Sequence, residues 1–323
     1  MTLALQLPLY NGSRYLPILF ASLQQQTDQD WECFVVEDSL DANERLQAER
    51  FFESHPNPRF HFFVSKENRG FSGGHQFLFE QHQADLIFLI NQDTFFEPDF
   101  IEQIRRYMET HPDIGAATGK ILRWHFAADG SPEKTSFIDS LGLVCKPSQK
   151  VMDRQTGKED GENAHEPEEV FGVSGCLPFY KRSAVLQTSY NGQLFDPAYH
   201  LYKEDVDLAY RLRAGGWKSV VLPWVIAYHE RTFQQSLLHK DQSYRVQFQS
   251  YRNHWWNLLT HLTWKDWLKN AWAILPFEMA KIGFFLFWKR TPSVLWKTWQ
   301  ETKTYWPTIQ QKRLFWKEFH KQH

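Results

Sequence analysis

Short apolar runs alternate with segments of helical periodicity in the first third of the chain. Continuous apolar runs of this kind predict buried strands, whereas apolar residues at every third or fourth position predict amphipathic helices. Strands are predicted at 3–9, 31–36, 60–65 and 85–90, and helices at 15–26, 41–54 and 76–82. Strand and helix units in series predict an open, mostly parallel α/β sheet flanked by helices.

Polar residues follow each of these strands directly. One acid after a strand carries little information, because turns favour Asp and Asn in any protein. In open α/β sheets, however, ligands bind at the carboxyl ends of the strands, so polar groups repeated along that edge predict a site. These residues are Asn11 after the first strand, Glu37 and Asp38 after the second, Asn68 and Arg69 after the third, and Asn91 and Asp93 after the fourth.

A second helix and strand pair is predicted further along the chain, with a helix over 204–214 and a strand over 218–229. Glu204 and Asp205 stand at the helix start and His229 at the strand end. Acids are favoured in the first turn of any helix, so a solvated acid pair and a reactive pair facing a cleft both remain open from these residues alone.

The segment between these two regions is polar at first and apolar later. Residues 125–169 predict a hairpin and a long surface loop, which inside a domain is usually functional or disordered. Residues 170–185 predict a buried strand, in which Ser174 and Gly175 would let a ligand or another backbone approach closely.

The composition, 42% hydrophobic and 23% charged over 323 residues, argues against disorder. Three cysteines are too few and too far apart for a disulfide framework or a zinc cluster, which fits a reducing compartment. The first eleven residues lack a basic region and a long apolar run, so they predict a strand and not a signal peptide. We therefore expect a cytoplasmic protein.

Charge and tryptophan content both change near residue 230. Residues 231–323 carry 15 Lys and Arg against 5 Asp and Glu, and hold ten of the 14 tryptophans, whereas residues 1–230 carry 21 against 33. This predicts a domain boundary followed by a basic, aromatic helical region. Pro276, Glu278 and Lys281 interrupt its most apolar run, so we expect no membrane span.

Two alternatives remain open for this basic region. Its helices either lie on an anionic membrane surface or pack on the first domain or on a second subunit. A nucleic-acid partner is not expected, because no nucleic-acid-binding fold accompanies the basic residues.

Seven segments, in this order and spacing, resemble the family-2 glycosyltransferases of the GT-A fold, and the resemblance covers about residues 3–260. The segments are LPLYN, VVEDS, ENRGFSGGHQF, LINQDT, VSGCLPFYKR, FDPAYHLYKEDVDLAYRLRAGGW and AYH. FIDSLGLV (137–144) and DRQTGKEDG (153–161) are similar to the rhamnosyltransferase-like bacterial enzymes that build surface polysaccharides.

The resemblance implies a divalent cation, Mn²⁺ or Mg²⁺, on the diphosphate of a nucleotide-sugar. Asn91, Gln92 and Asp93 occupy the place of the DxD motif, with Asp93 as the carboxylate ligand and Asn91 in place of the first acid. His229 matches a position at which many members supply a histidine to the same metal. A hard cation held by such ligands neutralises charge on the departing diphosphate.

The resemblance also implies the reacting groups on the acceptor side. Asp205 matches the catalytic base that removes the proton of the acceptor hydroxyl, and Glu204 would orient the acceptor or support the base. Ser174, Gly175 and Tyr202 would form the acceptor or sugar pocket.

Further residues match the nucleotide-contacting positions of the family. Leu9 stands where Thr is common, and His75 stands where Asn is usual, which are departures from the pattern. A tight strand-to-helix turn explains the glycines as well as a diphosphate contact does. The matching positions are Pro8, Tyr10, Asn11, Glu37, Asp38, Asn68, Arg69, Gly70 and Gly74.

The implied function is inverting transfer of a sugar, dTDP-rhamnose or a UDP-hexose being the favoured donors, to a glycan or lipid-linked glycan at the inner face of the cytoplasmic membrane. Residues 1–124 would bind the nucleotide-sugar and 125–230 the acceptor. An inactive GT-A module that only binds sugar nucleotide or glycan is one alternative. A sugar nucleotidyltransferase is another, but its Gly-rich basic signature is missing, since only Arg14 follows the first strand.

Overall fold

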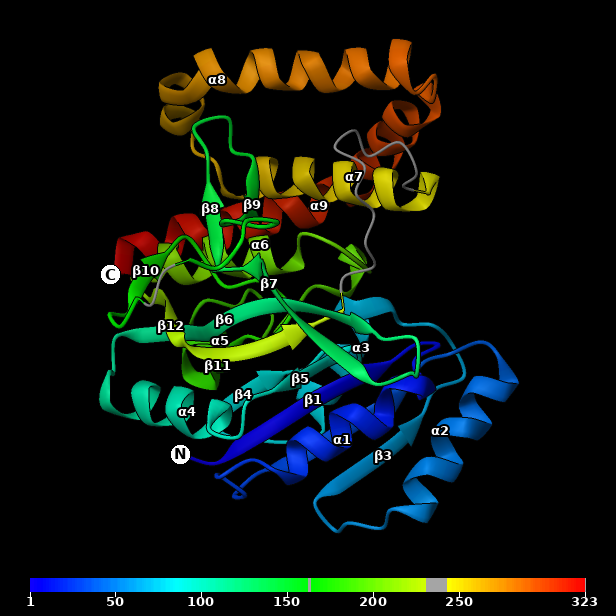
Figure 1. Cartoon of the computed structure of the whole chain (residues 1–323). Helices are drawn as coiled ribbons and strands as arrows, with labels where there is room; N and C mark the ends of the chain where they lie inside the picture. Colours follow the sequence, from blue (N-terminus) through cyan, green and yellow to red (C-terminus); the bar gives the residue numbers. More distant parts are fainter. Residues whose placement is uncertain (162–163, 231–242, 323) are drawn as a thin grey trace.

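The computed structural model describes residues 1–161, 164–230 and 243–322. A large mixed sheet runs through its centre (Figure 1). The first four strands pair in parallel, in the order β4-β1-β2-β3, which confirms the predicted open α/β sheet. They are β1 (Leu3–Leu9), β2 (Glu32–Glu37), β3 (Phe60–Val64) and β4 (Leu86–Leu89).

The second half of the sheet is mixed and extends from β4 in the order β11-β6-β12-β10. Two more strands leave this path, since β5 pairs with β12 and β7 pairs with β6. A separate small sheet is formed by β8 (Leu143–Cys145) and β9 (Val151–Asp153). The remaining strands are β5 (Thr94–Phe96), β6 (Ile114–Phe126), β7 (Pro132–Ser140), β10 (Glu168–Val170), β11 (Phe179–Lys181) and β12 (Lys218–His229).

Helices cover both faces of the sheet because the central strands are apolar on both faces. In β4, Leu86 and Phe88 join the core shared with α1, α2 and α4, whereas Ile87 and Leu89 join the core shared with α3, α5 and α6. The alternation is the period of two expected for a strand buried on both sides. The helices are α1 (Leu16–Gln24), α2 (Ala42–Ser54), α3 (Gly70–Glu80), α4 (Phe100–Thr110), α5 (Arg182–Gln187) and α6 (Glu204–Ala214).

Two sequence predictions for the middle of the chain are wrong in part. Residues 125–169, predicted as a hairpin and a loop, contribute β7 and β10 to the main sheet and form β8 and β9. Residues 170–185, predicted as one strand, contain the last residue of β10, the short β11 and the start of α5. Small residues and a proline around 172–178 favour an irregular backbone there.

Three long helices follow in the basic region and lie on one side of the sheet, away from β1 to β3 (Figure 1). α7 and α9 pack together through stacked Trp256 and Tyr305, whose ring centroids are 4.0 Å apart. The predicted boundary near residue 230 adjoins 231–242, which lie outside the described residues, and it stays a prediction. The helices are α7 (Tyr244–His261), α8 (Trp264–Gly283), the π-helical turn η3 (Phe284–Trp288) and α9 (Pro292–Gln322).

One helix among the described residues, Trp264–Trp288, is long and apolar enough by length and composition to cross a membrane. We expected Pro276, Glu278 and Lys281 to interrupt this run. The helix continues past them, and Glu278 is buried with its carboxylate 2.8 Å from His254 Nε2 on α7.

Candidate functional site

A cavity of about 350 Å³ lies at the carboxyl ends of β1 and β4. Most of the residues predicted to contact a nucleotide-sugar line it. His200 and Leu201, which follow η2 (Pro197–Tyr199), and the first turns of α7 also line it and were not predicted as site residues. The lining residues are Pro8, Leu9, Tyr10, Asp38, Asn68, Gly70, Phe71, Ile90, Asn91, Gln92, Asp93, His200, Leu201, Arg245, Val246 and Gln249.

Gln92 ties the end of β4 to the loop after β1. Its Oε1 accepts from Tyr10 N at 2.9 Å, and its Nε2 donates to Tyr10 O at 3.1 Å. A Cβ at Gly12 would lie 2.1 Å from Gln92 Oε1, so only glycine leaves room for this side chain. Gln92 therefore positions the backbone that leads into Asp93.

The two acids after β2 lie in different surroundings. Asp38 lines the cavity, accepts from Arg69 N at 3.1 Å, and has its pKa raised to about 6 by burial. Glu37 does not line the cavity. It accepts from Ser39 N at 2.7 Å, and Ser39 Oγ in turn accepts from Asn11 N at 2.8 Å. Glu37 and Asn11 thus brace the loops, and Asp38 is the acid that faces a ligand.

The glycines around the start of α3 permit close packing. Gly70 has a φ of +67°, and a Cβ there would lie 2.5 Å from the carbonyl oxygen of His200. Ser72 N donates to that same oxygen at 3.1 Å. Gly74 does not line the cavity, but a Cβ there would lie 3.0 Å from Pro8 Cβ. Gly70 therefore fixes one wall of the cavity, and Gly74 fixes the distance between α3 and β1.

Asp93 and His229 lie side by side because β5 pairs with β12, with His229 opposite Thr94. Asp93 Oδ1 is 3.4 Å from His229 Nε2. The other ring nitrogen, Nδ1, is 2.8 Å from Oδ2 of Asp139 on β7. A carboxylate on one imidazole nitrogen fixes the ring and directs the other nitrogen toward a metal ion. Asp139 was not identified as a site residue from the sequence.

The donor atoms around Asp93 fit a divalent cation. Asn91 Oδ1 is buried and has no hydrogen-bond partner among the described residues, so an oxygen ligand is available beside the Asp93 carboxylate. Carboxylate, amide and imidazole ligands suit Mn²⁺, and the oxygen ligands suit Mg²⁺.

Asp139, Cys176 and His229 form a second group, whose possible ligand atoms all lie within 4.8 Å of one another. In this group Asp139 Oδ2 already lies 2.8 Å from His229 Nδ1, whereas the Asp93 carboxylate faces the other ring nitrogen, Nε2. The pair of Asp93 and His229 is therefore the better candidate for holding the cation.

Asp205 is held at the start of α6 by two backbone hydrogen bonds. Its Oδ2 accepts from Gly175 N at 3.1 Å, and its Oδ1 accepts from Val206 N at 2.8 Å. Burial raises the pKa of Asp205, which increases the affinity of this carboxylate for a proton. The side chain is thus fixed in position and suited to act as a base.

Two consecutive residues connect Asp205 with the candidate metal ligands. Gly175 donates to Asp205, and Cys176 lies beside His229. Phe71, which lines the cavity, has its ring 3.4 Å from the position of a Cβ at Gly175. The structure therefore brings the predicted donor and acceptor groups to either side of this short segment.

None of the three residues predicted for an acceptor or sugar pocket, Ser174, Gly175 and Tyr202, lines the cavity. Ser174 is buried, and Tyr202 is exposed with a φ of +70°. Two neighbours of Tyr202 share this left-handed geometry, since His200 has a φ of +60° and Lys203 a φ of +68°. Non-glycine residues in this region each cost about 1 kcal/mol or more.

Asn253 of α7 stabilises this strained loop. Its Nδ2 lies within hydrogen-bond distance of three loop carbonyl oxygens, at 3.0 Å from Tyr199 O, 3.0 Å from Leu201 O and 2.7 Å from Tyr202 O. Asn257 Nδ2 donates to Lys203 O at 3.0 Å. α7 therefore holds the backbone that directly precedes Glu204 and Asp205, besides lining the cavity through Arg245 and Gln249.

The burial of Glu204 predicts how the free energy of unfolding depends on pH. It is 6% exposed, and burial, followed by the charge of Asp205, raises its pKa to about 8. Glutamate in an unfolded chain titrates near pH 4.3, so between about pH 5 and 8 the folded state retains a proton that the unfolded state has lost. Over this range rising pH should lower the free energy of unfolding of the wild type relative to Glu204→Gln, by up to about 1.4 kcal/mol per pH unit.

Urea unfolding of both proteins at three pH values in this range measures the difference. A difference that is constant with pH would contradict the raised pKa of Glu204.

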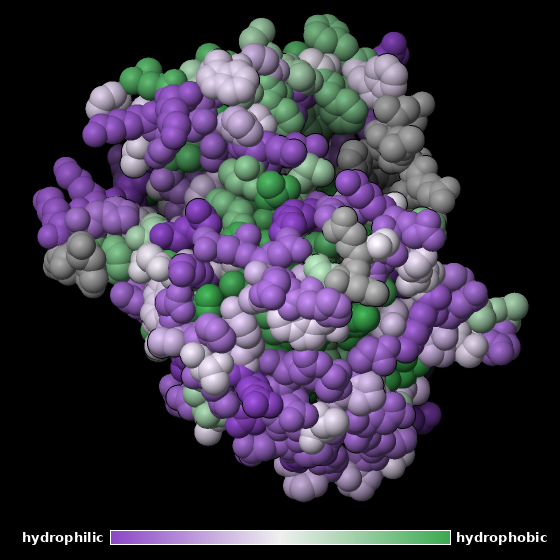
Figure 2. Space-filling model, turned by 60° about the vertical axis from the view of Figure 1, so that its left-hand side comes forward, coloured by the Kyte–Doolittle hydropathy of each residue, from purple (hydrophilic) through white to green (hydrophobic). Residues whose placement is uncertain are grey.

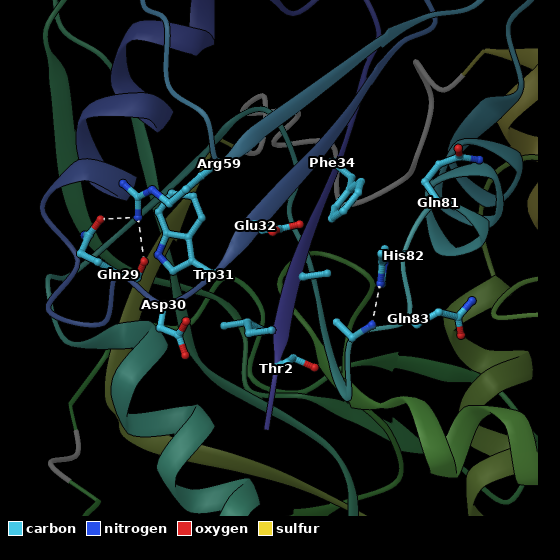
Figure 3. Close-up of a pocket in the computed structure, with 13 residues that line it drawn as sticks. Thr2, Gln29, Asp30, Trp31, Glu32, Phe34, Arg59, Gln81, His82 and Gln83 are labelled. Carbon is cyan, nitrogen blue, oxygen red and sulfur yellow. Dashed lines mark hydrogen bonds between the residues drawn. The ribbon is translucent and has the colours of Figure 1, made fainter.

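A larger cavity, of about 590 Å³, lies at the opposite ends of β1 and β2 (Figure 3). There the Arg59 guanidinium lies 4.0 Å from the Trp31 ring centroid and donates to Gln29 Oε1 at 2.6 Å. These polar groups bind one another, and the amino ends of parallel strands are not where such sheets bind ligands. The smaller cavity is therefore the stronger candidate.

Comparison with known proteins identifies the family. The model of glycosyl transferase family 2 matches residues 6–187. No curated protein sequence matches the chain.

Solved structures share the fold at low sequence identity. GalNAc-T7 with UDP, GalNAc and Mn²⁺ aligns with a TM-score of 0.61 at 11% identity, over 80% of this chain and 48% of that one. The mannosyltransferase PcManGT from Pyrobaculum calidifontis, in complex with GDP-Man and Mn²⁺, aligns with a TM-score of 0.54 at 12% identity. This alignment covers 98% of this chain and 84% of PcManGT. S. aureus TarS aligns with a TM-score of 0.50 at 12% identity, over 82% of this chain and 50% of TarS. The chain thus spans about half the length of GalNAc-T7 and TarS.

Proposed function

Because the chain belongs to glycosyl transferase family 2, an inverting and metal-dependent family, we propose that it transfers a sugar from a nucleoside-diphosphate donor to an acceptor hydroxyl. The observation that carries the proposal is the arrangement of Asp93, His229 and Asp139 at the edge of a cavity whose other wall leads, through Gly175, to Asp205.

In this proposal the cavity binds the nucleotide half of the donor. Asp38 accepts a hydrogen bond from the base or ribose, and Asn68, in the loop before α3, and Gly70, at the start of α3, approach the same group. Arg245 of α7 supplies a positive charge at the cavity wall for the diphosphate. A divalent cation held by Asp93 and His229 would neutralise the charge that the departing diphosphate accumulates.

Asp205 then acts on the acceptor. Its carboxylate takes the proton of the acceptor hydroxyl while that oxygen forms a bond to the anomeric carbon, and the bond from this carbon to the diphosphate oxygen breaks. Attack opposite the leaving group inverts the anomeric configuration. The hydrogen bonds from Gly175 N and Val206 N keep the carboxylate in position, and the negative charge passes to the released nucleoside diphosphate.

The favoured donors are dTDP-rhamnose and a UDP-hexose, and the favoured acceptor is a glycan or lipid-linked glycan of a surface polysaccharide. The segments FIDSLGLV and DRQTGKEDG, which are similar to rhamnosyltransferase-like bacterial enzymes, support this choice. In the structure, FIDSLGLV supplies Asp139, the partner of His229.

Thermal unfolding with a panel of nucleoside diphosphates tests the proposal. We expect UDP, dTDP or GDP to raise the melting temperature only when Mn²⁺ or Mg²⁺ is present, because the cation bridges the protein and the diphosphate. At a hundredfold excess over Kd the stabilisation amounts to about 2.7 kcal/mol, several degrees for a chain of this size. No stabilisation by any nucleoside diphosphate with either cation would contradict the proposed donor.

A further inference from the structure

α8 and η3 expose a continuous apolar stripe. The side chains recur every three or four positions, so they lie on one face of the helix. Several are mostly exposed, with Trp272 at 72% and Met279 at 71%. Hydrophobic side chains gather at this end of the molecule, whereas the opposite end is mostly hydrophilic (Figure 2). The stripe consists of Trp264, Leu268, Trp272, Leu275, Met279, Ile282 and Leu286.

The opposite face of α8 attaches the helix to α7. Ile274 is fully buried against Leu258 and Leu262, and the Glu278 carboxylate lies 2.8 Å from His254 Nε2. Ile274 and Glu278 are the only buried residues of α8 among the described parts of the chain. The stripe therefore makes no contribution to the core of the protein.

The charges around the stripe have one sign. Lys265 and Lys269 are exposed beside it, and Arg290 is exposed beyond its end. The two acids of this helix have other roles. Asp266 forms the N-terminal capping box with Thr263, and Glu278 is buried. Tryptophan beside lysine and arginine is typical of helices that lie at a membrane interface, with the apolar face among acyl chains and the cations near phosphates.

Both ends of this helix are fixed to the same bundle. α7, which precedes it, and α9, which follows it, are joined by Arg252 with Glu301 and by Trp256 Nε1, which donates to Thr302 Oγ1 at 3.0 Å. A helix that spans a bilayer must place its ends on opposite sides of about 30 Å of hydrocarbon. α8 meets this condition only if α7 separates from α9, so a flat orientation fits the fold.

A second copy of the chain fits the stripe less well. In a two-fold symmetric contact the stripe would face its own image. Lys265 and Lys269 would then approach either their own counterparts, if the two helices run parallel, or the basic end of the second helix that carries Arg290, if they run antiparallel. Like charges placed together cost free energy, whereas anionic phosphates complement them.

We propose that α8 and η3 dock flat on an anionic lipid bilayer, with the apolar stripe at the boundary between headgroups and acyl chains. α7 lies between α8 and the sheet (Figure 1), and it carries Arg245 and Gln249 of the cavity, so docking holds the cavity close to the membrane surface. The proposal goes beyond the transfer reaction and rests on the surface alone.

Co-sedimentation of the full chain with vesicles tests the docking. We expect binding to vesicles of phosphatidylcholine with phosphatidylglycerol, weaker binding to phosphatidylcholine alone, and release at high salt. Replacing two stripe residues, Trp272→Glu with Met279→Glu, should weaken binding at least about tenfold, because two charges would enter the acyl boundary. Lys265→Glu with Lys269→Glu should weaken binding to the anionic vesicles only.

The matched control carries Leu40→Glu with Leu46→Glu, two exposed apolar residues on the opposite half of the molecule, and should bind like the wild type. Stabilisation by a nucleoside diphosphate with Mn²⁺ should be the same in all these proteins, because none of the replaced residues lines the cavity. Vesicle binding is thereby measured separately from donor binding.

Three results would overturn the proposal. The first is no binding to anionic vesicles, or equal binding of the stripe variant and the wild type. The second is a dimer of the wild type in light scattering that the stripe variant loses, which would assign the stripe to a second copy. The third is retention on membranes after alkaline carbonate extraction, which would indicate a membrane span.

Discussion

Asp205→Asn should lower the rate of sugar transfer by about 10²- to 10⁴-fold and leave the affinity for the nucleoside diphosphate unchanged. The asparagine amide keeps the size of the carboxylate but cannot take the acceptor proton. Asp205 does not line the donor cavity, so the cation and the nucleotide retain their contacts. Initial rates with saturating donor and cation measure the first quantity, and calorimetric titration with the nucleoside diphosphate and Mn²⁺ measures the second.

A charge-matched control uses Asp129→Asn, which removes an exposed carboxylate in the turn between β6 and β7. This variant should transfer at the wild-type rate. Normal transfer by Asp205→Asn would exclude Asp205 as the base, and loss of donor binding in that variant would indicate a structural role instead.

Asp93→Ala should abolish the increase in nucleoside diphosphate affinity that Mn²⁺ produces in the wild type. The variant removes the carboxylate beside His229 Nε2, so the cation loses its charged ligand and the diphosphate loses its bridge to the protein. Titration with the nucleoside diphosphate, with and without Mn²⁺, measures this effect. In Asp93→Ala the affinity with Mn²⁺ should equal the affinity without it.

A graded variant separates metal binding from general damage. Asp139→Asn leaves the cavity wall intact but weakens the orientation of His229, so the Mn²⁺ affinity should fall by about 10- to 100-fold without being lost. Asp99→Ala, at an exposed position before α4, should leave it unchanged. If Mn²⁺ still raises the nucleoside diphosphate affinity of Asp93→Ala as much as that of the wild type, the cation binds at other residues.

The sequence predicts the parallel half of the sheet well because its signals are local. Each of the first four strands is a compact apolar run, and each ends within one or two residues of the predicted position. α3 is the exception, since it begins at Gly70 and not near Gln76. Three of its first five residues are glycines, which weaken the helical signal, and the contacts of Gly70 and Gly74 with distant parts of the chain make glycine necessary there.

The mixed half could be predicted only in part, since several of its strands are short or polar. β7 is polar along most of its length and pairs with β6, and β10 has three residues and pairs with β12. Short or polar strands at the edge of a sheet carry little hydrophobic periodicity. Their existence follows from the pairing and not from their own composition.

The residues of the site also divide into those that a local sequence signal marks and those that it does not. Asp38 and Asp93 follow apolar strands, which is a signal that the sequence contains. Asp139 lies in the quoted segment FIDSLGLV but on a polar strand, so nothing local marks it as the partner of His229. Arg245 and Gln249 were missed because the change in composition near residue 230 suggested a separate region, although α7 lines the cavity.

The strained loop before Glu204 has a consequence for synthesis on the ribosome. Its backbone is held by the side chains of Asn253 and Asn257, and the bond from Asn253 to Tyr199 O joins residues 54 positions apart. When the loop is translated, the residues that stabilise its left-handed conformation have not yet been made. The loop that precedes the acid pair therefore gains its stabilising bonds late, and a nascent chain that stops before α7 lacks both these bonds and the part of the cavity wall that Arg245 and Gln249 supply.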